Sequence, residues 1–335
     1  MKRIAVFFIF VCIAISSLPL YADSGLARLK NTILSSYTLS LSPQFGMLWG
    51  QGEEQVYTTG NKLYSQLLWD IKPLLYVGMS IDFSRKYPLE GPGIFGVFST
   101  KFGIPANSGV MEDRDWLARG GILSNYSRHD NFTDGAMILD MTTGLSIPAW
   151  RFLVIRFSVG FSCTRFSWDA YDGYYQYGRY DKINKEYEPL KNSDPVIPLN
   201  GAVISYSQDW FSLPFGLGVS IFPGRLFSGT LYCDAGPVIK FFGQDNHYKR
   251  ENDDWNLFAD KSDGGYVMEF GGEFKFSPRE KFSLLLRSSW RDINTGPGRE
   301  SFGRRPSTKE WSYFGKTSGG RFRALDLGIG FEVRL

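Results

Sequence analysis

The C-terminal segment of the chain alternates strictly between apolar and polar side chains. From residue 325 to residue 335, every odd position is apolar and every even position is Asp, Glu, Arg or Gly. A period of two predicts a β-strand with one apolar and one polar face. A strand of a soluble sandwich can alternate in this way, but a long amphipathic strand at the end of a chain is typical of bacterial outer-membrane barrels.

Similar segments recur along the whole chain and predict ten strands. They lie at about 35–56, 63–84, 93–106, 135–147, 152–168, 201–222, 226–246, 264–276, 281–292 and 321–335. Short connections at 148–151, 223–225 and 277–281 alternate with long polar ones at 107–134, 169–200, 247–263 and 293–320. The turn at 85–92 is longer than the other short turns, and it fits this pattern least well. We therefore predict an all-β fold, namely a ten-stranded antiparallel transmembrane β-barrel with long extracellular loops, because closure leaves no unpaired strand edge in lipid.

The first residues predict a secretory signal peptide over 1–22. Lys2 and Arg3 precede an apolar run that ends near Ile15, and small residues lead to Ala22. A retained membrane anchor is the alternative, although the run is short for a span of about 20 residues. Residues 23–335 are then expected to form a single outer-membrane β-barrel domain.

Composition narrows the classes of protein further. Aromatic residues make up 16% of the chain, which favours strands over helices. No segment after the signal offers about 18 consecutive apolar residues, so no transmembrane helix is expected. The chain has 37 basic and 34 acidic side chains. When Lys2 and Arg3 are left out with the signal, the two charges nearly balance, so the net charge does not support nucleic-acid binding.

The tryptophans and cysteines carry smaller predictions. Trp69, Trp168, Trp210 and Trp290 are predicted to face lipid or to form the aromatic girdles of the barrel. The two cysteines outside the signal are expected on the lipid face, two strand spacings (about 9–10 Å) apart. A disulfide needs Cα atoms within about 7 Å, so both are predicted to be free thiols.

Candidate chemistry lies in two acidic segments. His247 follows Asp245 at a spacing of two, and Asp113 and Asp115 form an acidic pair with the same spacing. If both termini are periplasmic, both pairs follow strands that run outward. A single acidic loop is usually a solvated surface, but two such segments that converge over one barrel mouth predict a cleft.

These residues resemble the omptins, outer-membrane proteases with ten-stranded barrels. The resemblance covers most of the chain after the signal and is carried by "EEQVY", "YSQLLW", "MEDRDW", "SRH" and "DNHY" in this order. It implies that Asp113 and Asp115 face a catalytic water and that Asp245 and His247 form an Asp–His dyad. It also assigns supporting roles around the substrate: Glu54 at the base of a pocket for a basic side chain, Met111 and Ile204 along the cleft, and Ser127 beside His129.

The residue types suit hydrolysis by an activated water. Imidazole accepts a proton near neutral pH, and an adjacent carboxylate can fix its tautomer and stabilise the cation that forms. Opposing carboxylates can accept hydrogen bonds from the same water and orient it. We therefore predict an outer-membrane endopeptidase of aspartic, omptin type whose site faces the exterior, with no metal and no cofactor. Its expected partners are cell-surface polypeptides and outer-membrane lipid but no nucleic acid, and it is expected to be a monomer.

Two departures from the family pattern affect these predictions. Omptins that strongly prefer Arg or Lys carry a second pocket acid where this chain has Gly243, so a basic preference is favoured over an altered specificity without being fixed. The basic position of the family's lipid site is kept as Arg165, whereas Cys163, Phe161 and Trp210 stand at its other positions.

The strand that carries the predicted dyad must change the direction of its side chains before it reaches Asp245. Strict alternation would place Ile239 and Phe241 on the lipid face, and the same parity would turn Asp245 and His247 away from the cleft. A bulge or twist is therefore predicted near Gly243.

Two alternative functions stay open. One is an adhesin-like barrel that binds host proteins through 169–200 and 293–320, with weak or altered proteolysis. The other is a passive pore, which is disfavoured because ten strands leave an interior largely filled by side chains.

Overall fold

The computed structural model describes residues 35–58, 60–248, 256–296, 300–304, 312–313 and 317–335. Nearly all of the regular structure in these ranges is antiparallel β-sheet. The predicted signal peptide at 1–22 lies outside the described residues and stays a prediction. In the described part of the chain, no helix has the length and hydropathy required to span a membrane.

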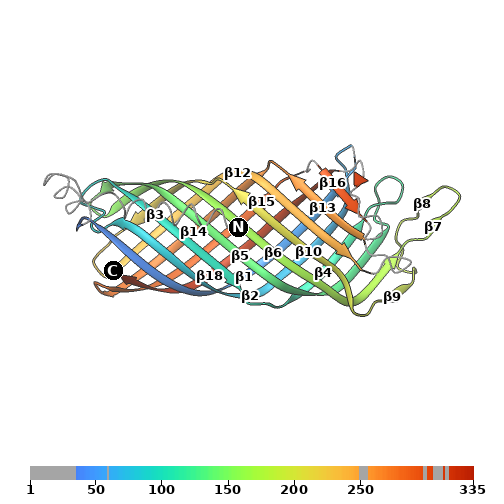
Figure 1. Ribbon diagram of the computed structural model, residues 1–335, viewed down its shortest axis with the longest axis horizontal. Coiled ribbons are helices and arrows are strands. Elements are labelled where there is room, and N and C mark those ends of the chain that lie inside the picture. Colours follow the sequence, from blue (N-terminus) through green and yellow to red (C-terminus); the bar gives the residue numbers. More distant parts are fainter. Residues whose placement is uncertain (1–34, 59, 249–255, 297–299, 305–311, 314–316) are drawn as a thin grey trace, which may run out of the picture.

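The main sheet closes on itself as a ring (Figure 1). β1 (Tyr37–Tyr57) pairs with β2 (Leu63–Arg85) on one side and with the last strand, β18 (Thr317–Arg334), on the other. The ring continues through β3 (Gly93–Gly103) and β4 (Ala106–Asp115), then β5 (Asn125–Trp150) and β6 (Leu153–Tyr177), then β10 (Ala202–Ser212) and β11 (Phe215–Ile221), then β12 (Phe227–His247), β13 (Asn256–Ser262) and β14 (Tyr266–Arg279), and β15 (Phe282–Asn294). The pairs of β18 with β1 and with β15 close the ring.

Short segments gather at one end of the ring. β7 (Tyr180–Asp181), β8 (Glu186–Tyr187), β9 (Val196–Pro198), β16 (Glu300–Arg304) and β17 (Ser312–Tyr313) lie there, whereas the C-terminus lies at the opposite end (Figure 1). The short connections between β5 and β6, and between β14 and β15, also lie at the end opposite β7 to β9. The predicted division into a short-turn end and a long-connection end is therefore visible in the arrangement of the strands.

The expected all-β antiparallel fold is confirmed, but the strand boundaries differ from the prediction. The sheet comprises 16 strand segments. Pairing is interrupted near Pro105, between β3 and β4, and near Pro214, between β10 and β11, and β9, β13, β16 and β17 add further short segments. Proline cannot donate a ladder hydrogen bond, so pairing breaks at such positions. The predicted polar connections at 107–134 and 247–263 are also partly strand, as β4, the start of β5, and β13.

A band of exposed apolar side chains surrounds the ring. Val77, Phe45, Ile329, Leu286 and Phe274 are neighbours across five successive strands, and all are exposed. A contiguous apolar band of this kind is what the lipid-facing surface of an outer-membrane barrel requires. The 25 residues of β6 extend over about 80 Å at the usual rise per residue. Even when tilted, such a strand projects well beyond a hydrocarbon core of about 30 Å.

A cluster of aromatic side chains occupies part of the interior of the ring, and the tryptophan prediction is wrong for three of four residues. Trp69, Trp168 and Trp210 are at most 1% exposed and belong to the core. Trp69 stacks on Trp168 with ring centroids 6.0 Å apart, and both stack on Tyr206 at 5.6 and 6.0 Å. Only Trp290 has the expected exposure, at 39%. Alternation along each strand decides which tryptophans point into the barrel, and the amino-acid composition does not show this.

The cysteine prediction is confirmed. Cys163 on β6 and Cys233 on β12 are free thiols. β10 and β11 lie between these two strands, as the expected spacing required.

Candidate functional site

Asp245 and His247 lie at the end of β12 and contact each other directly. His247 Nε2 is 2.5 Å from Asp245 Oδ2, and the side chains are 12% and 3% exposed. A carboxylate oxygen accepts hydrogen bonds, so Nε2–H is the donor of this contact and Nδ1 is the other ring nitrogen. The edge of the imidazole meets the ring of Phe258 on β13, with centroids 5.3 Å apart at an angle of 80°. The dyad is thus held in one orientation but still reaches solvent.

The predicted change of parity exists, but it lies at Ile239 and not near Gly243. Val238 pairs with Ser212 and Lys240 pairs with Phe211, so Ile239 is the extra residue of a bulge. Ile239 is 42% exposed, whereas Phe241 is fully buried, which corrects the expectation that Phe241 faces lipid. A bulge reverses the alternation of the strand beyond it. As a result, Gly243, Asp245 and His247 share the inward parity of Phe241.

Asp113 and Asp115 occupy the matching inward positions on β4. A second bulge, between Asn107 and Gly109, precedes them, and Gly109 adopts a φ of 108° that favours glycine. Beyond it, Met111 is fully buried, and the two aspartates follow it at every second position. Each of the two predicted acidic pairs therefore depends on a bulge in its own strand to face the interior.

Glu54 interacts electrostatically with a residue of each acidic pair. It lies on β1, is 4% exposed, and pairs in register with Leu67 and Gly320. Burial holds the pKa of the Glu54 carboxyl well above its usual range, and the charges of Asp245, Asp260 and Asp113 raise it further. These effects place Glu54 within electrostatic reach of both strands that carry the acidic pairs.

The site lies beyond the apolar band. On β18, Leu325 is the outermost exposed apolar residue of the band, and it pairs with Trp49. Glu54 pairs with Gly320, which lies further toward the end that carries β7 to β9. The carboxylates therefore do not lie at the depth of the lipid-facing band.

Ser127 and His129 form a second buried pair on β5. The Ser127 hydroxyl donates to His129 Nε2 at 2.8 Å, and His129 Nδ1–H donates to the carbonyl oxygen of Asp172 at 2.5 Å. Ser127 is paired in register with Asp113, and His129 with Met111, so the pair lies beside the acidic strand. The arrangement fixes one tautomer of His129 and directs its second nitrogen at the serine.

Burial lowers the pKa of His129, against the opposing effects of the Asp172 carbonyl and Asp130. In the unfolded chain a histidine titrates near ~6.5, so the unfolded state binds the proton first as pH falls. The stabilising contribution is complete above that value and is lost as pH falls through the lower folded pKa. The loss amounts to at most about 1.4 kcal/mol per pH unit.

We therefore expect His129→Gln to lose less stability than the unsubstituted protein between pH 7 and pH 5. Urea midpoints of the lipid-reconstituted protein at the two pH values measure this difference. An equal loss in both proteins would contradict the assignment of a neutral buried imidazole.

Of the remaining predicted residues, some lie inside the barrel and one lies on its outer surface. Met111 and Ile204 are buried in the interior, and Ile204 pairs directly with His247. Arg165 is half-exposed on the outside and forms an ion pair with Asp209 at 3.1 Å. An outward position suits contact with lipid, whereas buried Trp210 cannot replace a lipid-facing basic residue there.

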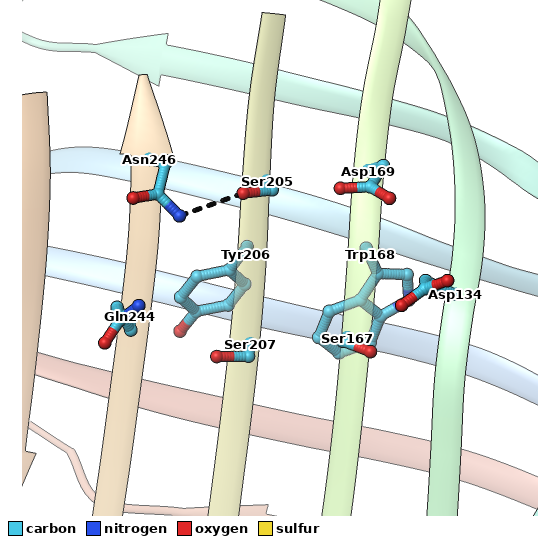
Figure 2. A pocket seen from close by; sticks show the side chains of 9 residues that line it. All are labelled: Asp134, Ser167, Trp168, Asp169, Ser205, Tyr206, Ser207, Gln244 and Asn246. Carbon is cyan, nitrogen blue, oxygen red and sulfur yellow. Dashed lines mark hydrogen bonds between the residues drawn. The ribbon is translucent and has the colours of Figure 1, made fainter. Parts of the chain in front are cut away.

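A polar hollow lies on the wall at β5, β6, β10 and β12 (Figure 2). Asn246 Nδ2 donates to Ser205 Oγ at 3.0 Å, and Gln244 and Ser207 line the same hollow. Gln244 and Asn246 have the opposite parity to buried Asp245, so the hollow and the acidic cluster are separate features. Asn246 consequently offers a neighbour of the dyad for control substitutions.

Asp260 is a site residue that the sequence patterns do not indicate. This residue is 3% exposed, pairs in register with Gly243, and hydrogen-bonds to Glu54. The segment 247–263 was expected to be a polar connection, and a strand assignment would have been needed to see that Asp260 has the inward parity of Phe258. The sequence holds no clear signal for this strand, because Leu257–Ala259 are all apolar and Asp260–Ser262 are all polar.

Comparison with known proteins identifies the fold family. A model of the omptin family matches residues 35–335. The crystal structure of outer membrane protease OmpT from Escherichia coli is similar with a TM-score of 0.73 and 17% identity, over 89% of this chain and 97% of that chain. At this identity, the structural likeness by itself shows the fold alone.

Other matches are much weaker. The toluene transporter TodX from Pseudomonas putida gives a TM-score of 0.31 at 8% identity, over 89% of this chain and 90% of that chain. The attachment invasion locus protein Ail of Yersinia pestis gives 0.26 at 10% identity, over 86% and 97%. Neither likeness carries an argument about this protein. A search among curated proteins finds no match.

Proposed function

The chain belongs to the omptin family, and from this membership we propose that it is an outer-membrane endopeptidase of the aspartic, omptin type. Its nucleophile is a water molecule held between the Asp245–His247 dyad and the facing pair Asp113 and Asp115. The observation that carries the proposal is the inward convergence of both acidic pairs, each produced by a bulge in its own strand, around the shared neighbour Glu54.

The proposed placement is an outer-membrane barrel of ten crossing strands. β3 with β4, β10 with β11, β13 with β14, and β15 with β16 each count as one interrupted strand. The exposed apolar band supports the crossing, and the short turns and C-terminus at the far end support an active site that faces the exterior. Arg165 would meet outer-leaflet lipid beside Asp209, and the protein would work as a monomer.

The proposed mechanism uses general-base catalysis. Asp245 accepts a hydrogen bond from His247 Nε2–H, so Nδ1 is the nitrogen that takes a proton from water. The carboxylate then stabilises the imidazolium that forms. Asp113 and Asp115 accept hydrogen bonds from the same water and orient its lone pair toward the peptide carbonyl. The histidine returns its proton to the leaving amine, so water is divided between the two products.

A cleavage assay in heavy-oxygen water tests this proposal. The lipid-reconstituted protein should cleave a peptide library, preferentially next to basic residues, and incorporate one oxygen from solvent into each new carboxyl group. A fluorophosphonate should label no residue, because no acyl-enzyme forms. Absence of cleavage by correctly inserted barrels would reject the peptidase assignment.

The Ser127–His129 pair favours one competing mechanism, nucleophilic attack by serine. Its geometry has a hydroxyl that donates to an imidazole whose other nitrogen is held by a carbonyl. Our proposal predicts that Ser127→Ala keeps more activity than His247→Ala, because His129 would act only through positioning. Peptide turnover by the two variants at equal barrel content measures the order. A covalent adduct on Ser127 would favour the competing mechanism instead.

An adhesin-like barrel with weak proteolysis is the alternative function. It would bind host proteins through the connections at 169–200 and 293–320, and it could keep the cluster intact. Binding of cells that survives His247→Ala, combined with no cleavage by the unsubstituted protein, would favour it.

A further inference from the structure

An irregular turn of the backbone in β6 lies directly opposite His129. Asp172 adopts a φ of 52° and Gly173 a φ of 90°, although both belong to an otherwise extended strand. A left-handed φ is uncommon for any residue other than glycine. A register shift between Arg128 and Asp130 leaves these two residues of β6 opposite His129 alone, which is the pattern of a β-bulge.

The left-handed backbone brings the carbonyl oxygen of Asp172 to the imidazole. In a regular ladder the carbonyl groups lie in the plane of the sheet and bond to the neighbouring strands. Here the Asp172 carbonyl oxygen is 2.5 Å from His129 Nδ1, and the histidine is 2% exposed. A side chain on Gly173 would begin 2.0 Å from the Arg128 carbonyl oxygen, so the close approach of the two strands requires glycine there.

Hydrogen bonds from the long connection hold Asp172 in this conformation. Asp172 Oδ1 accepts from the Gly201 amide at 2.7 Å, and the Asp172 amide donates to the Gly201 carbonyl at 2.9 Å. The Leu199 amide donates to the Gly173 carbonyl at 2.9 Å. The chain that joins β6 to β10 therefore returns to the bulge and is fastened to it on both sides of the Asp172 carbonyl.

The contact between Asp172 and His129 decides how Ser127 can act. A carbonyl oxygen only accepts, so His129 Nδ1–H is the donor, and Nε2 of the neutral ring accepts from the Ser127 hydroxyl at 2.8 Å. A serine hydroxyl has one proton and two lone pairs, so Ser127 offers lone pairs to any further partner. Ser127 is paired in register with Asp113, which places its oxygen beside the acidic strand of the site.

We propose that Asp172 is a positioning residue, whose carbonyl sets the tautomer of His129 and thereby makes Ser127 an acceptor for a backbone N–H of the bound peptide. The inference rests on the proposed peptidase function, because it names a contact with that substrate. With the opposite tautomer, His129 Nε2–H would donate to Ser127, and the serine proton would turn toward the peptide. Two donors would then face each other, and the peptide would be held less tightly.

Nitrogen NMR reads the tautomer directly, because the chain contains only two histidines. The protein is labelled with heavy nitrogen in histidine and reconstituted in lipid nanodiscs at about pH 8, above the usual titration range of the side chain. His129 should show a protonated Nδ1 and an unprotonated Nε2. Asp172→Ala removes the bond to Gly201 and disfavours the left-handed backbone. We expect the His129 signals to move toward the Nε2–H tautomer, while those of His247 stay in place.

Two further variants make this result specific. Asp172→Asn is conservative, since asparagine tolerates a left-handed φ and keeps an oxygen for the Gly201 amide, so it should retain the His129 signals. Asp181→Ala is the matched control, because this aspartate also accepts from backbone amides, in an exposed turn of the same connection. Unmoved His129 signals in Asp172→Ala, the same movement in Asp181→Ala, or a joint movement of His247 would overturn the proposal.

Peptide cleavage gives the functional readout. We expect Asp172→Ala to raise KM by about 3- to 10-fold, the range for one neutral hydrogen bond, with a smaller change in kcat, and Asp172→Asn to restore most of the loss. If no peptide is cleaved but the NMR signals behave as stated, the peptidase proposal fails and the control of the tautomer by Asp172 stands. If peptides are cleaved and KM stays constant while the tautomer changes, the contact assigned to Ser127 is wrong.

Discussion

Asp245→Asn is expected to lower kcat/KM for peptide cleavage by about 10²–10⁴-fold, the usual contribution of a positioned acid–base group. Asparagine keeps the size of the side chain but loses the charge that orients His247 Nε2 and stabilises the imidazolium. His247→Ala should reduce cleavage at least as much, because it removes the base itself. Turnover of a fluorogenic peptide by lipid-reconstituted protein measures both variants.

Asn246→Ala provides the matched control for this prediction. Asn246 lies between the two dyad residues in sequence, but it donates to Ser205 in the hollow described above (Figure 2). We expect its turnover to stay within a few-fold of the unsubstituted protein. If Asn246→Ala fell as far as Asp245→Asn, or if Asp245→Asn kept full turnover, the dyad would not be the catalytic base.

Trp168→Ala is expected to lower the free energy of unfolding by about 3–5 kcal/mol, the range for removal of a large aromatic core side chain. Trp168 is 1% exposed and stacks on Phe166 at 5.4 Å as well as on Trp69 and Tyr206. The ring also reaches across to Gly52, where an added side chain would begin 2.5 Å from it. Its loss leaves a cavity that neither strand can close.

Urea unfolding of the protein in lipid vesicles measures this effect. Trp150→Ala is the control, because Trp150 is 66% exposed at the short-turn end and leaves no cavity when it is removed. A clearly smaller loss is expected there. Equal losses in the two variants would contradict the view that the stacked aromatic rings stabilise the interior of the ring.

Some features could be derived from the sequence because they follow from local periodicity. The alternation in β18 needs only side-chain parity, and the apolar band around Phe45 and Ile329 follows from the same rule. Periodicity predicts strands less well outside the exposed apolar band. There both faces of a strand meet water or polar side chains, so β4 and β13 continue the backbone ladder without alternating hydrophobicity. The polar composition of these segments therefore predicts a connection where the structure has a strand.

The candidate site shows the same division. Spacing and resemblance identify the motif residues Asp113, Asp115, Asp245 and His247. A site that these residues share also requires their side chains to point into the barrel. The bulge that meets this demand lies at Ile239, because pairing with both neighbours of β12 decides where an extra residue fits. Asp260 could not be assigned, since its importance arises from its position opposite Gly243.

The sequence by itself determined that this chain is a β-protein with an apolar outer surface and the residue types of an omptin. These properties follow from the order of side chains along single strands. The tertiary structure alone decided which side chains fill the interior, where the two strands change parity, and which second carboxyl group meets Glu54. Those outcomes depend on register between strands, which is set by the closure of the whole ring and not by any one segment.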